Sequence, residues 1–219
     1  LYYSATTGDA AGYALDYVDA DGDGSSEVLI TAPLANLGAG SDSGAVYLSE
    51  GDESSTSMLL GTDMLSFTGE SSGDRAGWSV AGGGDVNDDG YEDILIGAYR
   101  DDDTDSNAGA VYLFLGPNSI ADIDVDLGDA DAKITGAVKS DGAGYSVAFG
   151  GTLNDDDYDD VLVGVWKDDN GASNAGAAYI LFGPVSGAVR LDGADVLLKG
   201  ERSSDQAGTV LVGGEDVND

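Results

Sequence analysis

The chain has 219 residues, of which 42% are hydrophobic and 35 are Gly, and it contains no Cys and no His. Its 42 acidic residues, 35 Asp and 7 Glu, face only 8 Lys and Arg, so the formal charge is −34. This charge excludes nucleic acid as a partner, because phosphate binding needs a basic face. The missing residue types exclude disulfides, thiolate metal sites and catalysis by Cys or His. The apolar content suffices for a folded core, and no stretch reaches the roughly 18 apolar residues of a membrane helix, so no membrane insertion is expected in this segment.

The sequence repeats itself with a period of about 65 residues. Each copy is anchored by an Ala-Gly pair, at residues 11–12, 76–77, 143–144 and 207–208. The same order then follows each time: a short apolar run, an Asp/Asn-rich loop, an aliphatic run, an acidic loop and a second apolar run. The chain is therefore predicted to be an array of equivalent units.

Each unit is predicted to hold four strands and no helix, because its apolar runs are short, β-branched and bounded by turn residues. After the run that follows Ala-Gly come the aliphatic runs at 28–30, 94–96 and 161–163. The third strands are expected at 45–48, 110–114 and 177–181, and a weaker fourth set at 64–67, 132–135 and 196–199.

This pattern predicts an all-β fold, a β-propeller segment made of four-stranded antiparallel blades, with a β-sandwich as the alternative. The end of a preceding blade is expected at 1–7, three blades at 8–69, 70–136 and 137–200, and the start of a further blade at 201–219. Three blades cannot close a ring. We therefore expect either a piece of a longer protein or a ring that other chains complete.

The loops between the first and second strands carry oxygen side chains in alternation, at positions 1, 3, 5 and 9, with Gly at position 6. Such spacing turns several hard oxygens toward one centre, and position 7 can add its backbone carbonyl, which is the chemistry of Ca²⁺ rather than of the more demanding Mg²⁺. The alternative is a solvated acidic hairpin loop. The predicted ligands of two calcium sites are Asp19, Asp21, Asp23, Ser25 and Glu27 in the first loop, and Asp85, Asn87, Asp89, Tyr91 and Asp93 in the second.

The third loop departs from this pattern. Thr152 stands at position 1 and Asp157 replaces the turn Gly, while the predicted ligands Asn154, Asp156 and Asp160 remain. A weaker third calcium site is therefore expected. A fourth loop begins with Asp216 and Asn218, and the sequence ends before its other ligands.

The order Ala-Gly-Tyr/Trp, Asp-x-Asn-x-Asp-Gly-x-x-Asp and Leu-Ile-Gly-Ala resembles the FG-GAP repeats of integrin alpha-subunit propellers and their bacterial relatives. Ala-Gly stands at the "FG" positions, and residues 31–33, 97–99 and 164–166 match "GAP". The resemblance implies a seven-bladed extracellular propeller, secreted or on the cell surface. It also implies Ca²⁺ in these loops, on the face opposite the usual ligand surface.

The leading functional prediction is a non-catalytic calcium-binding module for adhesion, recognition or assembly, with protein or glycan ligands at the face opposite the calcium loops. Acidic loops at 101–105 and 168–169 should make that face negative. One alternative is an accessory propeller of an extracellular enzyme that acts on polysaccharide or lipid. The other is a structural subunit that self-assembles into a filament or ring through its open blade ends.

One aromatic residue follows each of the first three Ala-Gly pairs, namely Tyr13, Trp78 and Tyr145. Regular recurrence predicts that these rings fill the wedge between neighbouring blades, shielded from solvent. Stacking on a ligand is the alternative role.

Overall fold

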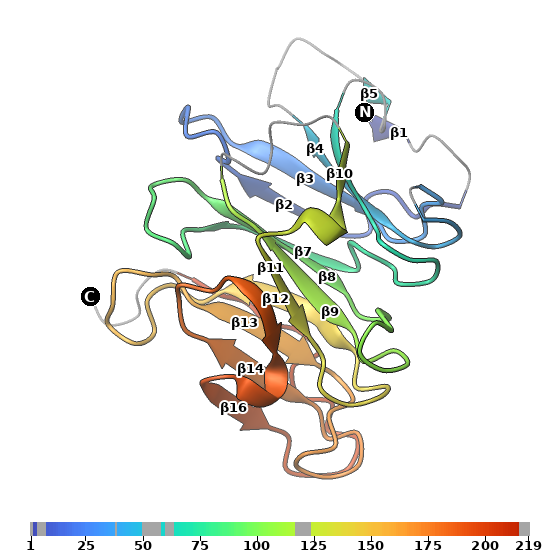
Figure 1. The fold of residues 1–219 in the computed structure, drawn as a ribbon, viewed down its shortest axis with the longest axis vertical. Coiled ribbons are helices and arrows are strands. Elements are labelled where there is room, and N and C mark those ends of the chain that lie inside the picture. Colours follow the sequence, from blue (N-terminus) through green and yellow to red (C-terminus); the bar gives the residue numbers. More distant parts are fainter. Residues whose placement is uncertain are drawn as a thin grey trace.

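A computed structural model describes residues 2–3, 8–37, 39–49, 58–59, 64–116 and 124–214. Within these ranges the chain is all-β, apart from two single-turn 3₁₀ helices, and it forms three consecutive propeller-like blades (Figure 1). The predicted fold class is thereby confirmed.

Each blade contains four antiparallel strands in chain order. Blade 1 holds β2 (Leu15–Val18), β3 (Glu27–Ala32), β4 (Ala45–Ser49) and β6 (Leu65–Thr68). Blade 2 holds β7 (Ser79–Gly84), β8 (Asp93–Ala98), β9 (Ala110–Phe114) and β11 (Ala132–Thr135). Blade 3 holds β12 (Ala143–Phe149), β13 (Val161–Val165), β14 (Ala177–Leu181) and β16 (Val196–Lys199).

A fifth strand crosses from blade 2 to blade 1 and from blade 3 to blade 2, and the sequence pattern did not predict it. β10 (Asp124–Asp126) lies between the third and fourth strands of blade 2 but pairs in parallel with β6 of blade 1. β15 (Gly187–Arg190) leaves blade 3 in the same way and pairs with β11 of blade 2. In the third instance β5 (Met58–Leu59) leaves blade 1 and pairs with β1 (Tyr2–Tyr3). We call the segments 124–127 and 187–191 straps, since each ties two blades together.

The apolar core lies between the blades. β8 of the middle blade is buried along its whole length, because blades 1 and 3 cover both of its faces. This explains why the second strands read as continuous aliphatic runs rather than as alternating ones. Each strap ends in a 3₁₀ turn, Leu127–Asp129 or Leu191–Gly193, whose leucine enters the core at the junction of two blades.

The Ala-Gly pairs anchor each blade against the previous one. Ala76 forms a parallel bridge with Gly44 of blade 1, and Ala143 forms the same bridge with Gly109 of blade 2. Gly77 has φ +78°, and a Cβ there would lie 2.8 Å from the carbonyl oxygen of Ala45. Only glycine meets both demands, left-handed backbone and close approach of two chains, so the pair recurs once per blade.

Candidate calcium loops

The three predicted calcium loops connect the first and second strands of the three blades. They project from the same end of the blades, along the left edge of the molecule in Figure 1. Adjacent loops contact each other, because the backbone N–H of Asp19 donates to Glu92 at 2.6 Å and that of Asp85 donates to Asp159 at 2.9 Å. The carboxylate at position 8 of one loop thus accepts a hydrogen bond from the backbone N–H of position 1 in the preceding loop.

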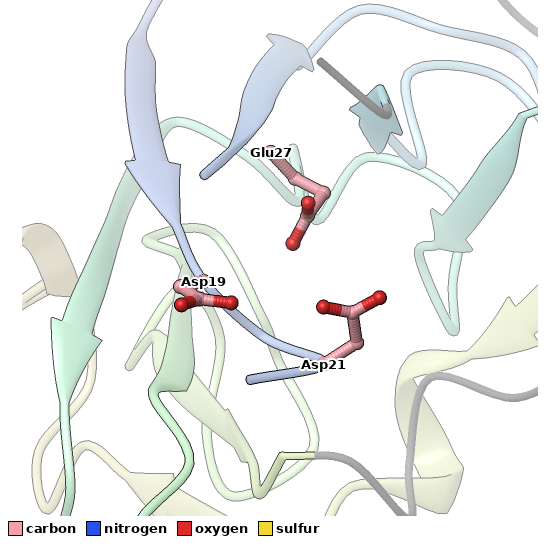
Figure 2. Close-up of side chains that lie close together, drawn as sticks. All are labelled: Asp19, Asp21 and Glu27. Carbon is pink, nitrogen blue, oxygen red and sulfur yellow. The ribbon is translucent and has the colours of Figure 1, made fainter. Parts of the chain in front are cut away.

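The first loop brings three carboxylates to one point. Figure 2 shows Asp19, Asp21 and Glu27 directed toward a shared space, and one oxygen from each lies within 4.8 Å of the others. Asp19 Oδ2 accepts from the N–H of Gly24 at 3.0 Å and Glu27 Oε2 from that of Ala20 at 3.1 Å. The other oxygen of Asp19, Oδ1, is buried and has no hydrogen-bond partner.

The remaining predicted ligands of the first loop shape its turn. Asp23 Oδ1 accepts from the N–H of Ser25 at 2.7 Å, while the N–H of Asp23 donates to Asp21 at 3.0 Å. Asp23 is exposed and stands outside the group of three converging carboxylates.

The second loop repeats the hydrogen bonds that positions 1, 5 and 9 accept in the first loop. Asp85 Oδ2 accepts from the N–H of Gly90, Asp89 Oδ1 from that of Tyr91, and Asp93 Oδ2 from that of Val86, at 2.9, 3.0 and 2.7 Å. The amide nitrogen of Asn87 donates to Asp89 at 2.9 Å. Asn87 Oδ1 is buried without a partner, at position 3 of the loop.

The third loop keeps part of the scheme. Asp156 Oδ1 accepts from the N–H of Tyr158 at 2.9 Å, and Asp160 Oδ2 from that of Leu153 at 2.8 Å. Asn154 donates its amide to Asp156 at 2.7 Å. Position 1 is Thr152, so the carboxylate that Asp19 and Asp85 provide is missing. Asp216 and Asn218 of the fourth loop lie outside the described residues.

The electrostatics of the loops favour a bound cation. Burial, together with the charges of Asp85 and Asp89, raises the pKa of Asp93 to about 7. Burial, followed by the charges of neighbouring aspartates, also raises the pKa of Glu27 and of Asp160. The salt bridges found among the described residues involve Lys133 and Arg190, not these loops. Clustered oxygens with orphaned acceptors fit a hard divalent cation such as Ca²⁺.

At the opposite end of the blades, part of the acidic loops at 101–105 and 168–169 is exposed, as a negative face requires, but other acidic residues there are not. Asp74, Asp101, Asp141 and Asp168 are almost fully buried, with exposed fractions of 1–6%. A second group of converging carboxylates, Glu70, Asp101 and Asp103, already holds the ammonium of Lys133. The chain's own cation therefore occupies this second group.

The aromatic residues that follow Ala-Gly contact one another across the blades but are not shielded. The ring centroids of Tyr13 and Trp78 lie 4.6 Å apart, and those of Trp78 and Tyr145 lie 5.7 Å apart. Tyr13 is 49% exposed, and Trp78 and Tyr145 are partly exposed. The expectation of a shielded wedge was wrong. In the described structure no further blade covers Tyr13, and Tyr99 and Trp166 complete a row of rings along this end.

The three blades form a propeller-like array, and part of the second blade matches a known repeat family. Residues 76–114, which run from the Ala-Gly pair to the end of β9, match the FG-GAP repeat family. Together with the relatives described next, this match supports the assignment of the chain to that family.

The relatives are integrin alpha proteins. Integrin alpha-PS5 of Drosophila melanogaster is 28% identical over 75% of this chain and 16% of its own length. Integrin alpha-6 of Gallus gallus is 30% identical over 72% of this chain and 13% of its own length. Integrin alpha-11 of Homo sapiens is 31% identical over 48% of this chain and 8% of its own length. The chain thus corresponds to a small part of each relative. No helix among the described residues is long and apolar enough to cross a membrane.

Proposed function

We propose that this chain is a non-catalytic, calcium-binding FG-GAP propeller module of a secreted or cell-surface protein, and that it serves adhesion, recognition or assembly. Ca²⁺ binds in the first two loops and more weakly in the third. The observation that carries the proposal is the convergence of Asp19, Asp21 and Glu27, with a buried oxygen of Asp19 left without a donor. The similarity to integrin alpha proteins supports the extracellular setting.

Ca²⁺ would neutralise carboxylates that otherwise repel one another at the ends of the first strands. Because Glu92 and Asp159 hold the neighbouring loops, an ion in one loop would also stiffen the loop beside it. The ions would then fix the spacing of the blades at one end. The opposite end is left for a protein or glycan ligand.

The test is thermal unfolding in Ca²⁺, in Mg²⁺ and in chelator. A ligand that binds only the folded state stabilises it by RT ln(1 + [L]/Kd), which is about 2.7 kcal/mol per site at 100 times Kd. We expect millimolar Ca²⁺ to raise the melting temperature distinctly more than Mg²⁺ does. Identical melting curves in Ca²⁺ and in chelator would disprove the proposal.

Two matched variants rank the loops in the same assay. Asp89 and Asp156 both occupy position 5 and accept from the N–H of position 7. Asp89→Ala should remove more of the calcium-dependent stabilisation than Asp156→Ala, since the second loop has the fuller ligand set. The reverse order would show that the ligands are misassigned.

A further inference from the structure

The two straps have the same geometry. Val125 lies opposite Phe67 in the parallel pair of β10 and β6, and Val189 lies opposite Ile134 in the pair of β15 and β11. One residue further on, the outer strand carries a threonine in each blade. The hydroxyl of Thr68 donates to the carbonyl of Val125 at 3.3 Å, and that of Thr135 to the carbonyl of Val189 at 3.4 Å.

Each strap also delivers a leucine into the core. Leu127 and Leu191 follow their valines by two residues and are 1% and 2% exposed. Both straps share the pattern Val-x-Leu-x-x-Ala-Asp, at residues 125–131 and 189–195. A strap is therefore a defined sequence element: a valine on the outer strand, then a leucine anchor between the blades.

The outer strand of blade 3, β16, has no such partner among the described residues. Its residue Leu198 occupies the place of Phe67 and Ile134, because each is the third residue of the fourth strand. Phe67 and Ile134 are 0% exposed, whereas Leu198 is 57% exposed and its neighbour Leu197 41%. Lys199 stands where Thr68 and Thr135 donate to the strap.

We propose that the outer edge of β16 is an acceptor for the strap of a further FG-GAP repeat. The strap adds as a parallel strand with its valine opposite Leu198 and its leucine anchored against blade 3. The occupant is identified by the chain's own two examples, which cover the equivalent edges of blades 1 and 2. The inference rests on the strand pairing and is independent of the proposed calcium function.

Disulfide trapping with a strap peptide tests the proposal, and the natural absence of cysteine leaves no competing thiol. The protein variant is Leu198→Cys. The probe is a synthetic peptide copying residues 185–195 with Val189→Cys, which the proposed register places opposite Leu198. Neighbouring strands lie about 4.8 Å apart, within disulfide reach. Both Leu197 and Leu198 are exposed, so the cysteine variants should fold, which circular dichroism verifies.

We expect Leu198→Cys to form the mixed disulfide at least about fivefold faster than Leu197→Cys, whose side chain points to the other face of the strand. A peptide of reversed sequence should react no faster than free cysteine. Excess cysteine-free strap peptide should compete, and the same peptide with Val189→Asp and Leu191→Asp should not.

Two results would overturn the proposal. Equal rates for the two protein variants, or for the forward and reversed peptides, would mean that the edge recognises no strap. Rapid disulfide dimerisation of Leu198→Cys without peptide would place a second copy of this chain on the edge instead.

Discussion

Blades 2 and 3 have the same order and pairing of strands, but they differ in how the charge of a buried aspartate is balanced. In both, the tyrosine of the third strand donates its hydroxyl to a buried aspartate, Tyr112 to Asp101 at 2.7 Å and Tyr179 to Asp168 at 2.5 Å. The residue paired with the tyrosine on the fourth strand is Lys133 in blade 2 and Leu197 in blade 3. The repeat thus fixes the strand register, while the charge of the site varies from blade to blade.

Besides the shared aspartate, the charged residues around Tyr112 in blade 2 are replaced by uncharged residues in blade 3. Glu70 and Asp103 accompany Lys133 in blade 2, whereas Ala137 and Asn170 stand at those places in blade 3. In blade 3 the amide of Asn170 donates to Asp168 and to the hydroxyl of Tyr179, so the aspartate is satisfied without a cation. Lys133 is therefore present to balance the charges of Glu70 and Asp103, and the blade fold itself does not require it.

Removing Lys133 should have the largest effect. Lys133→Leu leaves Glu70, Asp101 and Asp103 without a cation, in a site where Asp101 is 1% exposed. Breaking a buried ion pair costs about 3–5 kcal/mol, and partial exposure of Lys133 reduces this to roughly 2–4 kcal/mol. Denaturant unfolding of the variant and the parent measures the loss.

A transplant supplies the control for this prediction. The triple variant Glu70→Ala, Asp103→Asn, Lys133→Leu gives blade 2 the residues of blade 3 and should recover most of the lost stability, since these residues act as one network. A triple variant as unstable as Lys133→Leu would show that the lysine matters for packing rather than for charge.

The next largest effect is expected at Asp141, a buried acid that precedes blade 3 at the position that Asp74 holds before blade 2. Burial, together with the charge of Asp168, raises the pKa of Asp141 to about 7. The folded state therefore binds this proton more tightly than the unfolded state, and the associated stability is lost as the pH rises from about 4 through 7. At pH 8 the free energy of unfolding of Asp141→Asn should exceed that of the parent by about 1–2 kcal/mol, and the difference should shrink toward pH 5. A gain independent of pH would rule out this titration as the cause.

The sequence predicted the strands that recur in every blade, but it did not predict the straps that cross from one blade to the next. Short aliphatic runs and Ala-Gly pairs locate the strands of every blade, because each blade buries the same positions against its neighbours. The straps escaped prediction since Asp124–Asp126 has two charged residues around one valine and reads as a loop. The burial of Asp74 and Asp141 was also missed, because an aspartate's burial depends on a neighbouring blade that local sequence does not reveal.

The smallest effect is expected on calcium affinity, in the loops of blades 2 and 3, which differ in the residue at position 1. Position 1 holds Asp85 in blade 2, where its carboxylate accepts from the N–H of Gly90, and Thr152 in blade 3. Ligand charge tunes calcium affinity. Thr152→Asp should therefore tighten calcium binding by the third loop about five- to tenfold, or about 1 kcal/mol.

Titration calorimetry measures this gain when Asp21→Ala and Asp89→Ala have weakened the other two loops. Thr152→Asn is the matched control, because it adds an oxygen of similar reach without the charge. If position 1 is a ligand in blade 3 as the pattern of blade 2 predicts, Thr152→Asp binds more tightly than Thr152→Asn, and both bind more tightly than the threonine parent. Equal affinities for Thr152→Asp and Thr152→Asn would instead mean that Asp157, in the place of the turn glycine, has moved position 1 away from the ion. The two blades would then differ in the path of the loop as well as in its charge.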